Sequence, residues 1–486
     1  MSLINTTIRQ EARIARLQPY ITFRNEPFGG LVFNPYLGVE EELDPQATYA
    51  TGMIERGNAI GDITMALQSK FGIDVKAADI CLGQVIELLK RMYALNLTDE
   101  INTDRPRLHD SPDFGSDPPP YILPKSVIWE VTYRCNMRCP HCLTASGDPI
   151  SGELDTQQAL ELINGLARDK ILYLSLSGGE PFVRPDILTL LQAISQTNMR
   201  LDVATNGLMI PDEVYASLEE LDLFQVQVSI DGIGEAHDSF RGVAGSYTKA
   251  LHTVKKLREC GVSVSLGTTV TPGNVDYLDD LIDLALSLGC SGYKAIPFIS
   301  AGRGHNFADR LTLNSAQHEK FCRVIERRSQ ELEGCLRVVT ETSYSFLLKP
   351  PPKGYRAGKM GCSAGHDLLT IGADGTVYPC PFFHDLPVGK WDGSSLMGVW
   401  WNNPVLNRLR RFNLSDMAQS CQDCEYATIL CRGGCRAAAY MSTGDLAGKD
   451  PTCFKKYSHP PGILKESAIF ENCNAEVEPE MEGVSL

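Results

Sequence analysis

Two groups of closely spaced cysteines constrain this 486-residue chain more than any other feature of its sequence. Three of the sixteen cysteines lie between Cys135 and Cys142, and seven lie between Cys362 and Cys453. The N-terminus lacks the basic start and apolar stretch of a secretory signal, so we expect a cytoplasmic protein, in which structural disulfides are rare. Clustered cysteines in that compartment indicate metal ligands or redox groups.

The charge and hydropathy of the chain exclude several classes of partner. Lys and Arg number 45 against 60 Asp and Glu, a net charge of −15. This balance argues against a nucleic-acid or anionic membrane surface. No apolar run approaches the roughly 20 residues that cross a bilayer. At roughly 150 residues per domain, we expect about three domains.

Changes in composition divide the chain into successive parts. The stretch 102–120 is polar and rich in Pro and Asp, as linkers are. We predict the following division: a first domain over 1–105, a linker over 106–122, an alternating domain over 123–335, a cysteine-rich extension over 336–460 and an acidic tail over 461–486.

The first domain has the pattern of a β-hairpin followed by three helices. Short strands are predicted at 21–24 and 31–33, joined by a turn that contains Gly29 and Gly30. Helices are expected to begin at Asp44-Pro45 and to cover 59–71 and 76–95. This arrangement is typical of a small winged-helix-like domain. Because residues 17–100 lack the basic cluster that DNA binding needs, we expect a peptide partner.

The alternating domain has six predicted strands with helices between them. The strands lie at 127–131, 172–177, 201–205, 225–230, 263–270 and 293–297, and the helices at 156–169, 185–197, 211–221, 246–259 and 275–288. This alternation predicts an α/β fold with a parallel sheet, either a partial barrel or a doubly wound sheet. Ligands of such folds bind at the C-terminal ends of the strands.

The first cysteine group, Cys135-x3-Cys139-x2-Cys142, directly follows the first of these strands. Three thiolates in one loop can hold a [4Fe–4S] cluster and leave one iron open to a small molecule. Zinc is the alternative, and it requires a fourth ligand such as His141. Because His141 is adjacent to Cys142 in the chain, it can scarcely turn to the same metal. The spacing therefore favours iron–sulfur.

This loop resembles the signature of the radical SAM superfamily, and further motifs follow at later strand ends. They are Gly178-Gly179-Glu180-Pro181, Thr205-Asn206-Gly207, Ser229-Ile230-Asp231-Gly232 and the Arg241 region. The resemblance covers roughly 123–335 and implies a partial (β/α)6 barrel, with SAM and the cluster supplying a 5′-deoxyadenosyl radical. It implies SAM contacts from Gly178, Gly179, Glu180, Asn206, Ser229, Arg241 and Pro297, with 297–304 lining the adenine.

The chemistry of these residue types agrees with such contacts. An ammonium group needs a carboxylate such as Glu180, and glycines let backbone carbonyls approach closely. Arg241 suits the carboxylate of SAM. His237, Asp238 and His305 are candidates for a general base by position alone, and none is assigned.

The second cysteine group is spread over the C-terminal part of the chain as Cys362-x17-Cys380 and Cys421-x2-Cys424-x6-Cys431-x3-Cys435-x17-Cys453. Seven cysteines exceed one centre, and two structural zinc sites are the alternative to clusters. The series resembles the SPASM extension, which holds two auxiliary iron–sulfur clusters. That resemblance assigns Cys362, Cys380 and Cys435 to the first auxiliary cluster and Cys421, Cys424, Cys431 and Cys453 to the second.

The first auxiliary cluster lacks an expected fourth cysteine, because Leu369 stands where relatives carry one. An open iron, a non-cysteine ligand such as His366, or a [2Fe–2S] cluster would each account for this. We expect an open or labile site.

The overall resemblance is to radical SAM/SPASM maturases of ribosomally made peptides, nearest to the mycofactocin maturases. It rests on 129–133, 389–400 and 431–439, and on a stretch at 18–30 that is similar to PqqD-like precursor-recognition elements. It implies oxidative modification of a precursor peptide by decarboxylation, cross-linking or excision. The leader would be bound by 1–105 through strand addition, and a flavodoxin or ferredoxin would donate electrons.

Three alternatives remain open at this stage. Two are radical SAM enzymes, a sulfatase-type protein maturase and an enzyme that modifies a haem precursor. The third is a non-catalytic iron–sulfur electron carrier, which would not cleave SAM.

Overall fold

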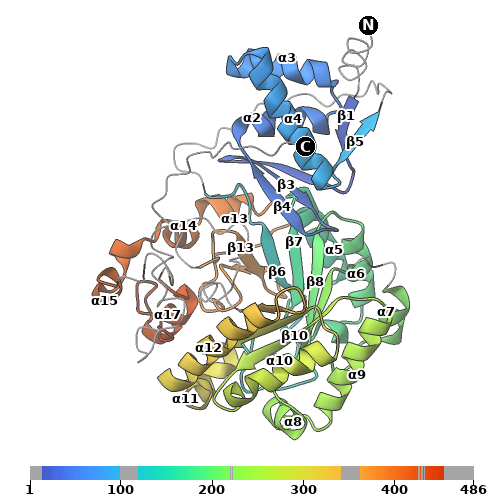
Figure 1. Ribbon diagram of the computed structural model, residues 1–486. Helices are drawn as coiled ribbons and strands as arrows, with labels where there is room; N and C mark the ends of the chain where they lie inside the picture. Colours follow the sequence, from blue (N-terminus) through green and yellow to red (C-terminus); the bar gives the residue numbers. More distant parts are fainter. Residues whose placement is uncertain are drawn as a thin grey trace.

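A ten-stranded, mostly parallel sheet lies at the centre of the molecule (Figure 1). The computed structural model describes residues 14–98, 119–340 and 362–453, apart from 219, 220, 222, 425, 426, 428–430 and 432. The linker predicted over 106–122 lies outside these residues up to 118, and the tail predicted over 461–486 lies wholly outside them.

Seven parallel strands stand side by side in the order of the sequence. They are β6 (Ser126–Glu130), β7 (Tyr173–Ser177), β8 (Arg200–Thr205), β9 (Gln225–Ser229), β10 (Val264–Val270), β11 (Gly292–Pro297) and β12 (Arg337–Val339). The connecting helices are α5 (Thr156–Arg168), α6 (Ile187–Ser195), α7 (Asp212–Ser217), α8 (Glu235–Arg241), α9 (Ser246–Glu259), α10 (Leu278–Ser287), α11 (Ala308–Leu311) and α12 (Ser315–Glu331). The predicted α/β alternation is confirmed, and β12 is a seventh strand that the sequence did not indicate.

The strands alternate apolar and polar residues, so the two faces of the sheet differ. In β7 and β9 the buried positions are Leu174, Leu176, Val226 and Val228, which join the helices in one hydrophobic core. Burying such side chains stabilises the fold by about 1.5–3 kcal/mol each. The residues between them are Ser and Gln, and they face the other way. That polar face is unusual for a parallel sheet, whose strands are generally apolar on both sides.

The C-terminal extension (362–453) joins the central sheet rather than forming a separate layer. β13 (Leu368–Ile371) pairs in parallel with β6, and β14 (Thr376–Tyr378) and β15 (Gly389–Lys390) follow antiparallel. Short helices complete the extension: α13 (Met397–Asn402), α14 (Pro404–Arg411), α15 (Gln419–Gln422) and α17 (Arg436–Thr443). Fully buried Trp400 donates from its indole Nε1 to the Tyr121 carbonyl at 2.8 Å, which fixes α13 against the segment leading into β6.

The N-terminal module (14–98) has its own core, between a small sheet and three helices. Its antiparallel sheet consists of β2 (Thr22–Glu26), β3 (Gly29–Asn34) and β4 (Val39–Leu43), and β1 (Ile14–Leu17) pairs with β5 (Leu95–Thr98). The helices are α2 (Pro45–Glu55), α3 (Ile60–Phe71) and α4 (Val75–Arg91). Asp44 caps α2 as predicted, by accepting from Ala47 N at 2.8 Å.

Two predictions for this module are wrong in detail. Gly29 and Gly30 lie in β3 and not in the turn, because they pair with Glu26 and Asn25 of β2. Glycine suits position 29 because a Cβ there would meet the Leu43 carbonyl oxygen of β4 at 2.2 Å. The helix predicted over 76–95 ends at Arg91. Tyr93 then adopts a φ of 52°, and the chain turns into β5.

The N-terminal module rests on the N-terminal end of the central sheet (Figure 1). Arg24 is buried, donates to the carbonyls of Leu123 and Pro124 just before β6, and pairs with Glu26 at 2.5 Å. Lys125 pairs with Glu40 of β4 at 2.6 Å. The module is thus tied to the segment that leads into the cysteine loop. In the described part of the chain, no helix is long and apolar enough to cross a membrane.

Candidate active site

The first cysteine group forms a loop directly after β6, held by backbone hydrogen bonds. Cys135 N donates to the Gly147 carbonyl at 2.9 Å, and Gly147 N donates back to the Tyr133 carbonyl at the same distance. Burial raises the pKa of Cys135 to about 11 and raises that of Cys139. Thiolates at these positions therefore need a cationic partner, as iron provides.

The Gly178-Gly179 pair, predicted from the sequence, lies against this loop. A Cβ on Gly178 would meet the Thr132 carbonyl oxygen at 2.4 Å, and one on Gly179 would meet the Arg134 carbonyl oxygen at 2.1 Å. Gly178 also has a φ of 118°, a conformation that favours glycine. Only glycines therefore fit between the end of β7 and the cysteine loop.

Glu180 and Asn206 continue the same site. The Glu180 carboxylate is fully buried and accepts from Thr205 Oγ1 at 2.8 Å and from Asn206 N at 2.7 Å. Burial raises the pKa of Glu180 to about 7. The Asn206 amide donates to Asn136 Oδ1 at 2.7 Å and lies 3.8 Å from Cys135 Sγ. The structure thus brings Glu180, Asn206 and the first cysteine together.

Arg241 is already paired in this structure. Its guanidinium lies 2.7 Å from the carboxylate of buried Asp231. Burial raises the pKa of Asp231, but the Arg241 charge, together with His141 and a hydrogen bond from Thr269 N, outweighs burial and leaves that pKa below the usual value. The Arg241 carbonyl oxygen lies 3.9 Å from Cys139 Sγ. His141 stacks on Phe240 with ring centroids 4.4 Å apart.

The three candidate bases serve structural contacts here. His237 is buried, its Nδ1 accepts from Asp231 N at 3.1 Å, and burial lowers its pKa to about 4. Asp238 accepts from the backbone amides of Gly245 and Tyr247 before and within α9. His305 is exposed and bonds to Ser300 Oγ at 2.9 Å.

The turn after β11 holds the cysteine loop, a contact that sequence reasoning missed. Arg303 Nη1 donates to the Cys139 carbonyl and Arg303 N to the Cys142 carbonyl, both at 3.0 Å. Its Nη2 reaches the Ser146 carbonyl. The stretch 297–304, expected to line adenine, therefore also braces the loop. Pro297 and Ser229 lie at the ends of β11 and β9, as predicted.

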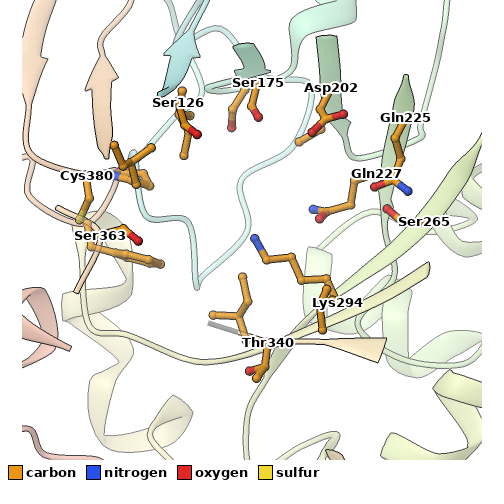
Figure 2. Close-up of a pocket in the computed structure, with 18 of the residues that line it drawn as sticks. Ser126, Ser175, Asp202, Gln225, Gln227, Ser265, Lys294, Thr340, Ser363 and Cys380 are labelled. Atoms are coloured by element: carbon orange, nitrogen blue, oxygen red, sulfur yellow. The ribbon is translucent and has the colours of Figure 1, made fainter. Parts of the chain in front are cut away.

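A cavity of about 590 Å³ lies against the polar face of the sheet (Figure 2). Leu143, next to Cys142, lines it at one point, and Cys362, Cys380 and Cys435 line it elsewhere. Strand residues supply most of the polar lining: Ser126, Ser175, Ser177, Asp202, Gln225, Gln227, Ser265, Lys294 and Arg337. The sequence signal for this cavity is the alternation of apolar and polar residues in Tyr173–Ser177 and Gln225–Ser229.

The three cysteines assigned to the first auxiliary cluster are thus brought to one cavity. Burial raises the pKa of Cys362, although the backbone amides of Ala364 and Arg436 donate to its thiol and lower it in part. Leu369 is fully buried, pairs with Val127 of β6 and belongs to the hydrophobic core, while Leu368 lines the cavity. The buried His366 bonds through Nε2 to the Leu409 carbonyl oxygen at 3.2 Å.

The remaining cysteines lie farther along the extension. Burial, with a smaller contribution from the neighbouring Cys453 and Cys424, raises the pKa of Cys431 to about 11. Cys424 N donates to the Cys421 carbonyl at 3.1 Å. Asp450 links both groups, since Oδ2 accepts from Cys435 N at 2.6 Å and its carbonyl accepts from Cys453 N. Within the described residues, no group of three or more His, Cys, Asp or Glu side chains could hold a single metal ion.

Comparisons with known proteins identify the families to which the cysteine loop and the C-terminal extension belong. Residues 129–285 match the Radical SAM superfamily, and residues 362–425 match SPASM, an iron-sulfur cluster-binding domain. The chain is 33% identical over 365 residues to mycofactocin maturase MftC of Mycobacterium ulcerans (strain Agy99), covering 74% of this chain and 94% of that protein. It is 30% identical to the AdoMet-dependent heme synthase of Methanosarcina barkeri, covering 68% and 96%.

The chain therefore belongs to the radical SAM enzymes with a SPASM extension. Its cofactors are a [4Fe–4S] cluster, SAM and auxiliary iron–sulfur clusters. The fold is also similar to SuiB of Streptococcus suis, solved bound to precursor peptide SuiA, with a TM-score of 0.67 at 17% identity, over 90% of this chain and 99% of that one. The tenth of the chain that the match to SuiB leaves out is shorter than the N-terminal module. At least part of this module is therefore included in the similar fold.

Proposed function

We propose that this enzyme oxidatively modifies a ribosomally made precursor peptide. One observation carries the proposal: a single cavity is lined by the residue after Cys142 and by three thiols of the C-terminal extension. A substrate in that cavity would lie within reach of both cysteine groups. Hydrogen abstraction and removal of the remaining electron can then occur in one place.

The proposed ligand assignment follows the distribution of thiols. Cys135, Cys139 and Cys142 would hold the cluster that binds SAM through its open iron. Cys362, Cys380 and Cys435 would hold one auxiliary cluster, and Cys421, Cys424, Cys431 and Cys453 a second one. When bound, the SAM cluster and SAM supply the 5′-deoxyadenosyl radical that removes hydrogen from the substrate. The burial of the thiols favours their binding to iron over the free thiolate form.

The protein residues would bind and orient SAM beside the loop. The ionised Glu180 carboxylate would accept the SAM ammonium, and the Gly178-Gly179 backbone would approach it closely. Asn206, Ser229 and Pro297 would complete the contacts. Arg241 would have to share its charge between Asp231 and the SAM carboxylate. The first auxiliary cluster would be open or labile at its fourth position, since Leu369 packs in the core.

Several finer features belong to this proposal. The seven sequential strands, each of which contributes at least one polar side chain to one cavity, support a partial barrel. The N-terminal module would be a winged-helix-like, PqqD-related element within 1–105 that adds the leader peptide as a strand. The alternating domain would span 123–335 and the cysteine-rich extension 336–460, and a flavodoxin or ferredoxin would donate electrons.

A haem-precursor substrate is the second candidate, because the heme synthase relative is 30% identical. The N-terminal module favours a peptide, since the similar fold of SuiB is solved with a precursor peptide. Binding of a leader segment to the N-terminal module would favour a peptide over a haem precursor as the substrate.

The test is anaerobic incubation of the reconstituted enzyme with SAM, a reductant and short peptides encoded beside its gene. We expect 5′-deoxyadenosine together with a mass change in one peptide. Formation of 5′-deoxyadenosine with no change in any peptide, but with conversion of a porphyrin precursor, would favour the haem reading instead.

A further inference from the structure

One wall of the cavity is polar in a way that the cofactors do not require. We call it the polar wall; it is formed by Ser175, Asp202, Gln225, Gln227 and Ser265 from four neighbouring strands, β7 to β10. Figure 2 shows these side chains converging on the space opposite Cys380 and Ser363. Neither SAM nor the proposed cluster ligands account for this set.

Asp202 is the acidic member of the polar wall. It lies in the middle of β8, three residues before Thr205, hence about 10 Å below the strand end at 3.3 Å per residue. One of its carboxylate oxygens is buried and has no hydrogen-bond partner among the described residues. Burial raises the pKa of Asp202 to about 6, although Arg200, Lys294 and Arg337 lower it. A buried carboxylate lacking a donor is costly, and a ligand that donates a hydrogen bond would offset that cost.

The charges around Asp202 restrict what such a ligand can be. Arg200 on the same strand, Lys294 on β11 and Arg337 on β12 all act on this carboxylate, so a cationic side chain would be repelled by them. An acidic side chain would meet Asp202 itself, which is mostly ionised above pH 6. The amides and hydroxyls of the wall can both donate and accept. They suit an uncharged group that does the same.

We propose that the polar wall binds the end of a long, uncharged side chain of the peptide, one ending in a hydroxyl or carboxamide that donates to Asp202. This inference rests on the proposed function and names the residue type that the cavity selects. Tyrosine and glutamine are the natural side chains with that length and chemistry. Asp202 is a specificity-determining residue in this assignment.

The test compares matched pairs of small probes by equilibrium dialysis against the holoenzyme under anaerobic conditions. The pairs are N-acetyltyrosinamide with N-acetylphenylalaninamide, and N-acetylglutaminamide with N-acetylleucinamide. We expect a preference of at least about tenfold for the hydrogen-bonding member of a pair, since a site built for a polar group discriminates strongly against its absence. In Asp202→Leu that preference should fall to less than about threefold.

Two further variants control the result. Asp212→Leu makes the same change at a fully exposed position and should leave the preference intact. Gln227→Leu removes a second polar-wall group and should reduce the preference even where Asp202→Leu loads iron poorly. Equal binding of both members of each pair, binding of neither, or an unchanged preference in both wall variants would overturn the proposal. Because this readout needs no turnover, it fails independently of SAM cleavage and peptide modification.

Discussion

The cysteine loop at 135–142 and the cysteines of the C-terminal extension flank one cavity, yet the chain builds them in different ways. The loop is a single turn of chain after β6, braced by Gly178-Gly179, Asn206 and Arg303 from the ends of other strands. In the extension, Cys362, Cys380 and Cys435 come from separate segments.

The two groups of thiols are held in position by different kinds of contact. The loop depends on the parallel sheet, which places the ends of its strands together. The extension depends on β13 pairing with β6 and on polar contacts such as those of Asp450. We therefore expect changes in the loop to abolish radical chemistry and changes in the extension to affect later steps.

The largest expected effect comes from removing one cysteine of each group. Cys139→Ala should lose about four irons and all formation of 5′-deoxyadenosine, because Cys139 is one of the three proposed ligands of the SAM cluster. Cys435→Ala should still cleave SAM but form no modified peptide. Iron analysis and chromatography of 5′-deoxyadenosine separate the two. SAM cleavage by Cys139→Ala at the wild-type rate would refute the assignment.

A substitution of Arg303 should weaken the support of the same loop and have a smaller effect. Arg303→Ala removes charge-assisted donors to the Cys139 and Ser146 carbonyls, and contacts of this kind typically change metal affinity by about 10–100-fold. The expected result is faster loss of the SAM cluster to a chelator and an altered EPR signal of the reduced cluster. Arg303→Lys should recover part of the stability. Arg310→Ala, on the exposed face of α11, is the matched control and should behave as wild type.

The pH dependence of SAM binding sharpens the role of Glu180. Burial raises its pKa to about 7, so the carboxylate gains a proton as the pH falls through 7. Protonation removes the attraction for the SAM ammonium. The KM for SAM should therefore rise by up to about tenfold per pH unit below 7 and level off above 8. In Glu180→Gln the KM should be high and nearly independent of pH across this range. A wild-type KM that does not change between pH 6 and 8 would contradict this role.

Asp450 gives the smallest expected effect and tests the extension alone. Asp450→Asn weakens the acceptor for Cys435 N, a loss of about 1–3 kcal/mol at a buried site. Auxiliary iron should be lost several-fold faster to a chelator, with SAM cleavage unchanged. Asp445→Asn, at an exposed position, serves as the control. A drop in SAM cleavage in Asp450→Asn would show that the two regions are not separable.

The sequence predicted the parts of the fold that depend on local pattern. Strand and helix periodicity indicated β6 to β11 and the helices between them, and the Asp44 cap is where the Asp-Pro pair indicated. Glu180 and Asn206 were singled out because their motifs, which directly follow strands, resemble those of the radical SAM superfamily. These features need no knowledge of distant contacts.

The remaining features depend on pairings between segments far apart in the chain. No local pattern says that β13 adds to β6, which buries Leu369 in the core and not beside the thiols. The bracing contact of Arg303 with the cysteine loop crosses more than 150 residues. The alternation of β7 and β9 indicated a polar face, but the polar wall became one surface only when β7 to β10 were placed side by side.

Transfer of a labelled hydrogen tests most directly that a peptide is oxidised in this cavity. A candidate precursor peptide deuterated throughout its non-exchangeable positions is incubated anaerobically with enzyme, SAM and reductant, and 5′-deoxyadenosine is examined by mass spectrometry. The account predicts one deuterium in 5′-deoxyadenosine, formed in step with the peptide product. Modification of the peptide with no deuterium in 5′-deoxyadenosine would contradict it.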